Sequence, residues 1–214
     1  MIIKQLNVGY LDQLAYIVGC NKTNKGVIID PGGKVDKILT EVKNYNLDIK
    51  LILNTHSHID HTLGNDLIKK STNAKIVIHR FEKELIDNGE NIFDIPTYKY
   101  APSPPADIII DKEQDLIVGD LKIRVIHTPG HTPGGLCYLI GDNLFTGDTI
   151  FVGDTGRTDL PGGDRKLLGK TLRRVMKMFD DDVSIWPGHD IGKKPFSTIG
   201  YEKKHNINAK EYGF

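Results

Sequence analysis

Three histidines and one aspartate crowd the stretch NTHSHIDHTLGN at residues 54–65. His56 and His58 are two positions apart, so in an extended chain their side chains point to the same side and can hold one ion. If a helix begins near Asp60, the direction changes there, and Asp60 and His61 can reach a second ion. A carboxylate also suits a helix start, where unpaired backbone N–H groups stabilise it. The spacing therefore predicts a metal site with a pair of ligands for each of two ions.

Three further candidate ligands stand in turns that follow apolar runs: His131 in HTPGHTPGG, Asp148 in FTGDT and His189 in WPGHD. Pro-Gly turns hold such side chains on a stiff backbone. Nitrogen and oxygen ligands suit zinc, iron or manganese. A bridging carboxylate, assigned to Asp148, would let two ions lie roughly 3.5–4 Å apart with a water between them that loses its proton near neutral pH. The predicted chemistry is attack of that hydroxide on a carbonyl or similar centre.

Each of these residues also has a structural interpretation. A single histidine at a strand end is usually a hydrogen-bonded structural residue, and the stretch 56–61 taken alone could be a polar turn. His79, His127 and His205 lie outside dense polar clusters, so we expect structural roles for them. The metal interpretation is favoured because the spacing in the first stretch and the later clusters agree.

Strands and helices alternate along the chain and place these clusters. Apolar or β-branched runs such as IKLILN, KIVIH, LKIRVIHT and NLFTGD predict strands, and KVDKILTEVKNYN, RFEKELIDNG and DRKLLGKTLRRVMKMFD predict helices. Two strand-rich halves with helices indicate an α/β fold in which two sheets pack together with helices outside. Every polar cluster falls where an apolar strand ends, so strand ends that converge on one rim would carry the site.

Length and composition are typical of a soluble globular protein of one domain. The 214 residues suffice for one core, and no composition break divides them, so we predict a single domain over residues 1–214. The 28 basic and 28 acidic residues balance, which argues against a nucleic-acid or membrane-surface binder. No apolar run is long enough to span a membrane, and the N-terminus lacks the features of a signal peptide. Two isolated cysteines, Cys20 and Cys137, are typical of buried apolar positions. We expect a cytoplasmic protein.

The motifs resemble those of a known superfamily. THSHIDH matches the His-x-His-x-Asp-His signature of the metallo-β-lactamase superfamily, and PGHT, GDT and PGHD match its later metal motifs in the same order, over essentially the whole chain. The resemblance implies a four-layer αββα sandwich with the site at one edge. It also implies two ligand sets and a bridge: His56, His58 and His131 for the first ion, Asp60, His61 and His189 for the second, and Asp148 between them.

Two acidic residues receive further roles from this resemblance. It implies that Asp60 acts in catalysis by orienting the nucleophilic water, in addition to its role as a ligand. Asp30, in IIDPGG, matches the superfamily's early acidic position. There the resemblance implies a residue that supports the site without binding metal, whereas the residue alone reads as a turn cap.

Within the superfamily, GRTDLPGGD at residues 156–164 and STIGYEKKHN near the end resemble the glyoxalase II-like branch, which hydrolyses glutathione thioesters such as S-lactoylglutathione. Full-length glyoxalase II carries an added helical C-terminal domain that helps hold glutathione, and this chain resembles the shorter members without it. The resemblance implies a thioester hydrolase with two divalent ions, zinc first and iron or manganese as alternatives. Its substrate would be a small-molecule thioester, for instance a glutathione conjugate.

Other activities of the superfamily remain as alternatives. GRTD, and GHD followed by an ST turn, also resemble persulfide dioxygenases, which use a single iron held by two histidines and an aspartate to oxidise glutathione persulfide. True β-lactamases usually carry a cysteine where Asp148 stands, which disfavours β-lactam hydrolysis. RNA-cleaving relatives normally carry extra domains and a basic surface, and the sequence shows neither. A non-catalytic metal-binding protein is the last alternative.

Arg157 and Thr158 closely follow the GDT motif, so we predict that they reach the rim of the site and bind substrate. Arg157 could hold a substrate carboxylate through two hydrogen bonds. Alternatively, it pairs with a nearby aspartate such as Asp159 and orders the loop. Tyr98 and Tyr100, in a proline-rich segment, are candidates for the mouth of the site, and tertiary packing would explain them equally well.

Overall fold

Six strands form the first sheet in the order β1-β2-β3-β4-β5-β6 within residues 1–88 and 103–214, which are the residues that the computed structural model describes. β1 pairs antiparallel with β2 and β2 with β3, whereas β3, β4, β5 and β6 are parallel neighbours. Parallel pairing needs crossover connections, which the helices after β3 and β4 provide. The strands are β1 (Ile2–Asn7), β2 (Leu14–Gly19), β3 (Lys25–Ile29), β4 (Asp48–Leu53), β5 (Lys75–His79) and β6 (Ile108–Ile110).

The second sheet contains six strands of the described chain in the order β12-β11-β10-β9-β8-β7. Hairpins make most of it antiparallel, and β10 and β11 are the parallel pair because a helix connects them. The sequence pattern did not predict the two-residue strand β12. The strands are β7 (Gln114–Val118), β8 (Leu121–His127), β9 (Leu136–Ile140), β10 (Asn143–Gly147), β11 (Ser184–Pro187) and β12 (Ser197–Thr198).

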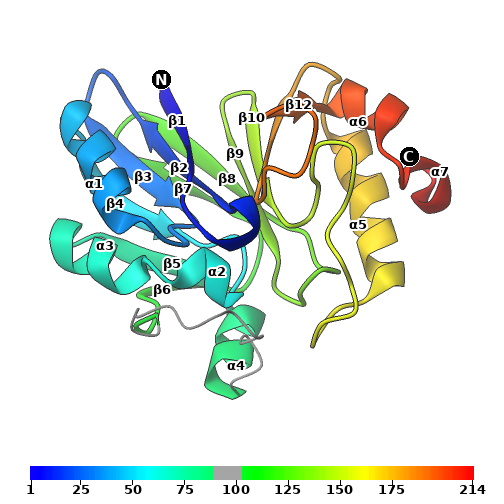
Figure 1. Ribbon diagram of the computed structural model, residues 1–214, viewed down its shortest axis with the longest axis horizontal. Helices are drawn as coiled ribbons and strands as arrows, with labels where there is room; N and C mark the ends of the chain where they lie inside the picture. Colours follow the sequence, from blue (N-terminus) through cyan, green and yellow to red (C-terminus); the bar gives the residue numbers. More distant parts are fainter. Residues whose placement is uncertain (89–102) are drawn as a thin grey trace.

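Helices cover the outer face of each sheet (Figure 1). α1 and α3 lie against the first sheet, and α5 lies against the second. α5 begins at a true cap, because the Asp164 side chain accepts a hydrogen bond from the Leu167 backbone N–H at 2.9 Å. The helices are η1 (Tyr10–Asp12), α1 (Val35–Asn44), α2 (Ile59–Thr62), α3 (Asn65–Thr72), α4 (Arg80–Asn88), α5 (Arg165–Met178), α6 (Ile199–His205) and α7 (Ala209–Tyr212).

Three hydrophobic clusters separate the four layers. Alternate residues of a strand point to opposite faces, so strands β1 to β5 of the first sheet contribute to two clusters. In β3, Val27 and Ile29 lie between the sheets, and Ile28 packs toward the α1 side. In β9, Tyr138 lies between the sheets and Cys137 packs in the cluster that contains α5. The predicted four-layer αββα sandwich is confirmed.

Both cysteines, Cys20 and Cys137, are free and buried, as the sequence predicted. Burial raises the pKa of the Cys137 thiol to about 11, so this side chain is uncharged at neutral pH and packs as an apolar residue. Within residues 1–88 and 103–214, no helix combines the length and the apolar character needed to cross a bilayer.

Candidate metal centre

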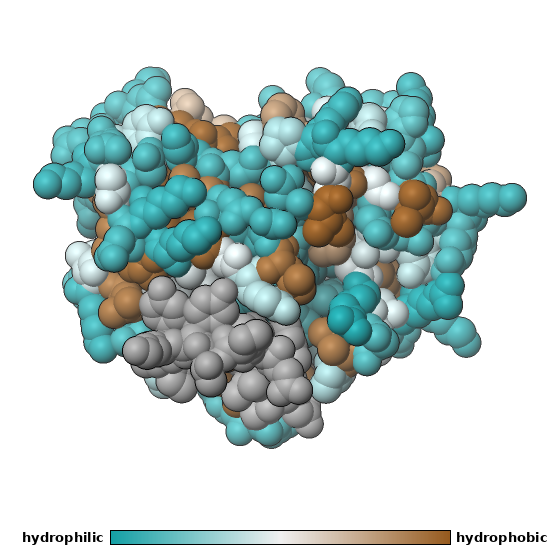
Figure 2. Space-filling view, viewed as in Figure 1, coloured by the Kyte–Doolittle hydropathy of each residue, from teal (hydrophilic) through white to brown (hydrophobic). Residues whose placement is uncertain are grey.

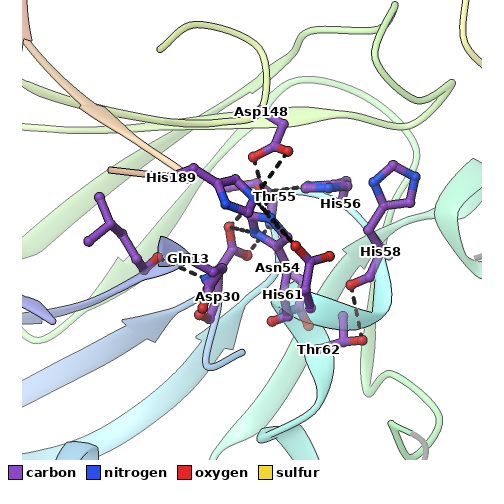
Figure 3. A network of polar contacts seen from close by, with 12 residues as sticks. Gln13, Asp30, Asn54, Thr55, His56, His58, His61, Thr62, Asp148 and His189 are labelled. Atoms are coloured by element: carbon purple, nitrogen blue, oxygen red, sulfur yellow. Dashed lines mark hydrogen bonds and ion pairs between the residues drawn. The ribbon is translucent and has the colours of Figure 1, made fainter. Parts of the chain in front are cut away.

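Four strand ends bring seven buried ligand candidates together, and Figure 3 labels all of them except Asp60 and His131. β4 belongs to the first sheet and leads into the histidine-rich stretch, whereas β8, β10 and β11 belong to the second sheet. α2 begins at Ile59, one residue before the start expected from the sequence. All seven residues predicted as ligands lie in this cluster: His56, His58, Asp60, His61, His131, Asp148 and His189.

Two groups of three possible ligand atoms lie in the cluster. The first contains His56, His58 and His131, and the second contains Asp60, His61 and His189; within each group the ligand atoms lie within 4.8 Å of one another. In the first group, His131 Nε2 lies 3.0 Å from His58 Nδ1. These are the same two groups that the sequence resemblance implied.

The Asp148 carboxylate lies between the two groups. Its Oδ1 is 3.3 Å from His61 Nε2, and its Oδ2 is 3.5 Å from His189 Nε2 and 3.6 Å from His131 Nε2. One carboxylate therefore contacts imidazoles of both groups. This is the position that a bridging ligand requires.

Three buried polar atoms of the cluster lack a hydrogen-bond partner among the described residues: His56 Nε2, Asp60 Oδ1 and Asp148 Oδ1. An unsatisfied buried acceptor costs about 1–3 kcal/mol, so native structures seldom keep one without a reason. All three are atom types that bind divalent ions. The donor set and its orphaned atoms therefore fit a metal centre.

Hydrogen bonds from Nδ1 to backbone carbonyls fix the orientation of two candidate ligands. His131 Nδ1 is 2.7 Å from the Arg157 carbonyl oxygen, and His189 Nδ1 is 2.9 Å from the Leu11 carbonyl oxygen. A carbonyl only accepts, so in both rings Nδ1 carries a hydrogen and Nε2 faces the cluster. Metal-binding histidines are held in this way in general.

Asp30 fixes the orientation of His61 in the same way. Its Oδ2 lies 3.0 Å from His61 Nδ1, while Oδ1 and Oδ2 accept hydrogen bonds from the Thr55 N–H (2.8 Å) and the Thr55 hydroxyl (2.6 Å). Its backbone is left-handed, with φ +47°, a conformation that aspartate tolerates better than most residues. Asp30 thus contacts a candidate ligand and lies outside the two groups described above, although its carboxylate also forms a third possible group with His56 and His61.

Burial and neighbouring charges divide the histidines into two kinds. Burial, helped by the nearby imidazole of His131, lowers the pKa of His58 to about 3, which leaves the ring neutral. Burial also acts to lower the pKa of His189, but the carboxylates of Asp148 and Asp60 outweigh it and raise that pKa to about 11. A metal ion must displace a proton there, so metal binding to this group releases protons.

Glu82 is a supporting residue that carries no signal in the sequence, where it reads as one more charged position of a helix. Its side chain is buried in the first turn of α4. Oε2 accepts hydrogen bonds from the Ser57 N–H (2.8 Å) and the Ser57 hydroxyl (2.7 Å), and Oε1 accepts one from the Gly134 N–H (2.8 Å). Because Ser57 stands between His56 and His58, this carboxylate ties two ligand-bearing loops together.

Replacing Glu82 with alanine is expected to weaken zinc binding about 10–100-fold, because both loops lose their common acceptor. Glu82→Gln keeps one acceptor oxygen and should show a smaller loss. Competition with a chromogenic chelator measures the affinity. Glu84→Ala removes an exposed carboxylate from the same helix and should bind zinc like the parent. Equal zinc affinity of Glu82→Ala and Glu84→Ala would contradict the role given to Glu82.

The two predicted substrate-binding residues lie differently. Arg157 lines a cavity beside Asp148, but its guanidinium donates two hydrogen bonds to the Asp159 carboxylate at 2.6 and 2.7 Å. The loop-ordering ion pair foreseen as its alternative role is therefore present. Thr158 is half-buried and is not among the described residues that line this cavity. Tyr98 and Tyr100 lie outside the described residues.

A family model decides the classification. The model of the metallo-beta-lactamase superfamily matches residues 8–189. The chain belongs to this superfamily. Among metallo-β-lactamase superfamily relatives, an uncharacterized protein of Aquifex aeolicus is 36% identical over 99% of this chain and 98% of its own length. The probable polyketide biosynthesis zinc-dependent hydrolase PksB of Bacillus subtilis is 29% identical over 92% of this chain and 83% of its own length. The hydroxyacylglutathione hydrolase GloC of Haemophilus influenzae is 28% identical over 96% of this chain and 100% of its own length.

Solved structures of the superfamily share the fold. BLEG-1, a B3 metallo-β-lactamase, superposes with a TM-score of 0.86 at 30% identity over 97% of this chain and 99% of its own. ETHE1 from Myxococcus xanthus superposes with a TM-score of 0.82 at 29% identity over 99% of this chain and 85% of its own. TTHA1623 in a di-iron-bound form superposes with a TM-score of 0.79 at 28% identity over 95% of this chain and 98% of its own. Superfamily members of this kind are in general metal-dependent hydrolases, and the names of these neighbours cover several substrates and metals.

Proposed function

We propose that this metal-dependent hydrolase cleaves thioesters of small molecules and holds two divalent ions, zinc in the first place and iron or manganese otherwise. The observation that carries the proposal is the Asp148 carboxylate, which contacts an imidazole of each three-residue group at 3.3–3.6 Å. A group of three ligands on each side of one carboxylate suits a pair of ions better than a single one. The similarity to GloC and PksB supports a hydrolase.

The roles of the residues follow from their positions. When bound, divalent ions supply Lewis acidity to the substrate carbonyl and lower the pKa of water. Asp60 has one buried oxygen without a hydrogen-bond partner in the described part of the chain, so it can orient the attacking water as well as bind metal. The oxygen of that water bonds to the carbonyl carbon, the C–S bond breaks, and the departing sulfur takes up a proton. His131 and His189 keep their rings fixed through backbone carbonyls during these steps.

Zinc-loaded protein is expected to contain about two zinc ions per chain and to hydrolyse S-lactoylglutathione or a simpler thioester equally fast in air and under nitrogen. Elemental analysis gives the metal content, and a thiol reagent follows the released sulfur. The same sample is offered a chromogenic β-lactam, because BLEG-1 is named a B3 metallo-β-lactamase. A rate that depends on oxygen, or a β-lactam cleaved in preference to every thioester, would refute the proposal.

A second candidate is a persulfide dioxygenase with a single iron. The GRTD and GHD motifs and the similarity to ETHE1 from Myxococcus xanthus support it. It requires one iron per chain and oxygen uptake with glutathione persulfide. The complete group of Asp60, His61 and His189 favours the hydrolase, since a single iron leaves these ligands without an ion. Iron-loaded protein that consumes no oxygen with the persulfide eliminates this candidate.

A further inference from the structure

A cavity of about 340 Å³ opens beside the metal centre. Asp148 and His189 form its inner wall, so whatever occupies it lies next to the candidate ligands. The segments around it come from the β1–β2 connection, the turn after β10 and the segment after β11. The remaining lining residues are Leu11, Asp12, Phe151, Thr155, Arg157 and Ile191.

Three of these residues give the cavity an apolar wall. Leu11 and Ile191 are 60% and 54% exposed, and Phe151 is buried behind them against His189, with 5.9 Å between the ring centres. Figure 2 shows hydrophobic side chains near the middle of the face where the β1–β2 connection approaches the segment after β11. Exposed apolar side chains gathered beside reactive groups indicate a surface that a ligand covers.

Leu11 has a backbone conformation that leucine disfavours. Leu11 and Asp12 have φ values of +52° and +56°, in the left-handed region that a branched side chain disfavours. The Leu11 carbonyl accepts the hydrogen bond from His189, and the Asp12 carbonyl accepts one from the Asp190 N–H at 3.0 Å. Strain of this kind persists where the surroundings fix it and concentrates at functional sites. The strained turn fixes a candidate ligand and presents Leu11 at the mouth of the cavity.

Charge argues against a glutathione moiety in the same place. Glutathione carries two carboxylates at neutral pH, and binding them needs unpaired cationic groups. Among the described residues that line the cavity, His189 is a candidate ligand paired with Asp60 and Asp148. Arg157 is the remaining cation among these described residues, and Asp159 already occupies its guanidinium. Asp12 adds a negative charge to the wall.

We propose that this cavity binds the acyl group of the thioester and that the preferred acyl group is an aliphatic chain longer than acetyl; this inference rests on the proposed thioester hydrolase. The product formed in the cavity is then a fatty carboxylic acid, and the thiol carrier leaves on the solvent side. Each methylene that enters the cavity leaves water, which favours binding by roughly fourfold per methylene.

The test compares acetyl, butyryl and hexanoyl thioesters of N-acetylcysteamine on the zinc-loaded protein. We expect kcat/KM to rise at least tenfold from acetyl to hexanoyl. Leu11→Asn and Ile191→Asn should each flatten this series, and asparagine accepts the left-handed backbone at position 11. Ile117→Asn is the matched control, because Ile117 is 66% exposed on β7, away from the cavity, and this variant should keep the full chain-length preference.

Two outcomes overturn the inference while thioester hydrolysis itself stands. One is equal kcat/KM for acetyl and hexanoyl thioesters, and the other is S-lactoylglutathione cleaved ten times faster than the hexanoyl thioester. If zinc-loaded protein cleaves no thioester, the proposed function fails, and the cavity is tested by calorimetry with the acids alone. Hexanoate should then bind at least tenfold tighter than acetate, and Ile191→Asn should abolish the difference; equal affinities for the two acids overturn the inference.

Discussion

Asp148→Asn is expected to lower kcat/KM for thioester hydrolysis by at least about a hundredfold. The loss of a supporting partner of a metal ligand already costs about 10–100-fold, and Asp148 contacts both ligand groups directly. The amide keeps the shape of the side chain but has no negative charge and one acceptor oxygen. One of the two side-chain oxygens that face the imidazoles thus becomes an NH2 group, which donates hydrogen bonds and cannot bind metal. Elemental analysis should show that the variant retains fewer than two ions per chain.

The matched control for this substitution is Asp142→Asn. Asp142 is exposed in the turn between β9 and β10, five residues before the end of the strand that leads to Asp148. The chemical change is identical, so Asp142→Asn should keep the activity and metal content of the parent. Unchanged turnover by Asp148→Asn would indicate a metal-binding protein without the proposed catalysis.

Gly32→Ala is expected to destabilise the protein by at least about 3 kcal/mol and to lower its melting temperature by roughly 6–12 °C. A Cβ atom at this position would lie 1.7 Å from the backbone carbonyl oxygen of Asp60 and 2.3 Å from Gln13 Oε1. A backbone atom cannot rotate away as the end of a side chain can. The stretch that carries Asp60 must therefore shift, so zinc affinity should fall together with stability.

Gly153→Ala separates crowding from backbone strain. Gly153 has φ +81°, and a Cβ there would meet no atom within 4 Å. This substitution should cost only about 1–2 kcal/mol, the penalty of a left-handed backbone, and should leave zinc affinity unchanged. Thermal unfolding and chelator competition on both variants measure the two effects. Equal destabilisation by the two substitutions would show that close approach to Asp60 is unimportant.

Ligands were predictable from sequence because their signal is local. Two-residue spacing in an extended stretch and a polar cluster at each strand end predict where side chains point, and all seven candidates do meet. The division of the stretch at Asp60 also corresponds to a real change of backbone, since α2 begins at Ile59. His79 and His127, expected to be structural, stack on each other with ring centres 4.4 Å apart.

Contacts between distant segments could not be predicted. Glu82 looks like any charged residue of an amphipathic helix until its carboxylate meets Ser57 and Gly134, which lie 25 and 52 residues away. Leu11 gives no sign in the sequence of a left-handed backbone, because the His189 and Asp190 segments that hold it come from the far end of the chain. These contacts depend on how distant segments pack in the folded protein, and local sequence propensities carry no information about that packing.

The ligands come from both sheets: the stretch after β4 belongs to the first, and the turns after β8, β10 and β11 belong to the second. An ion bound there would link the two sheets of the sandwich. Since the unfolded chain offers no such arrangement, free zinc at a thousand times its Kd would add about 4 kcal/mol to the free energy of unfolding. Metal supply would then govern how long each molecule survives in the cell as well as how fast it works.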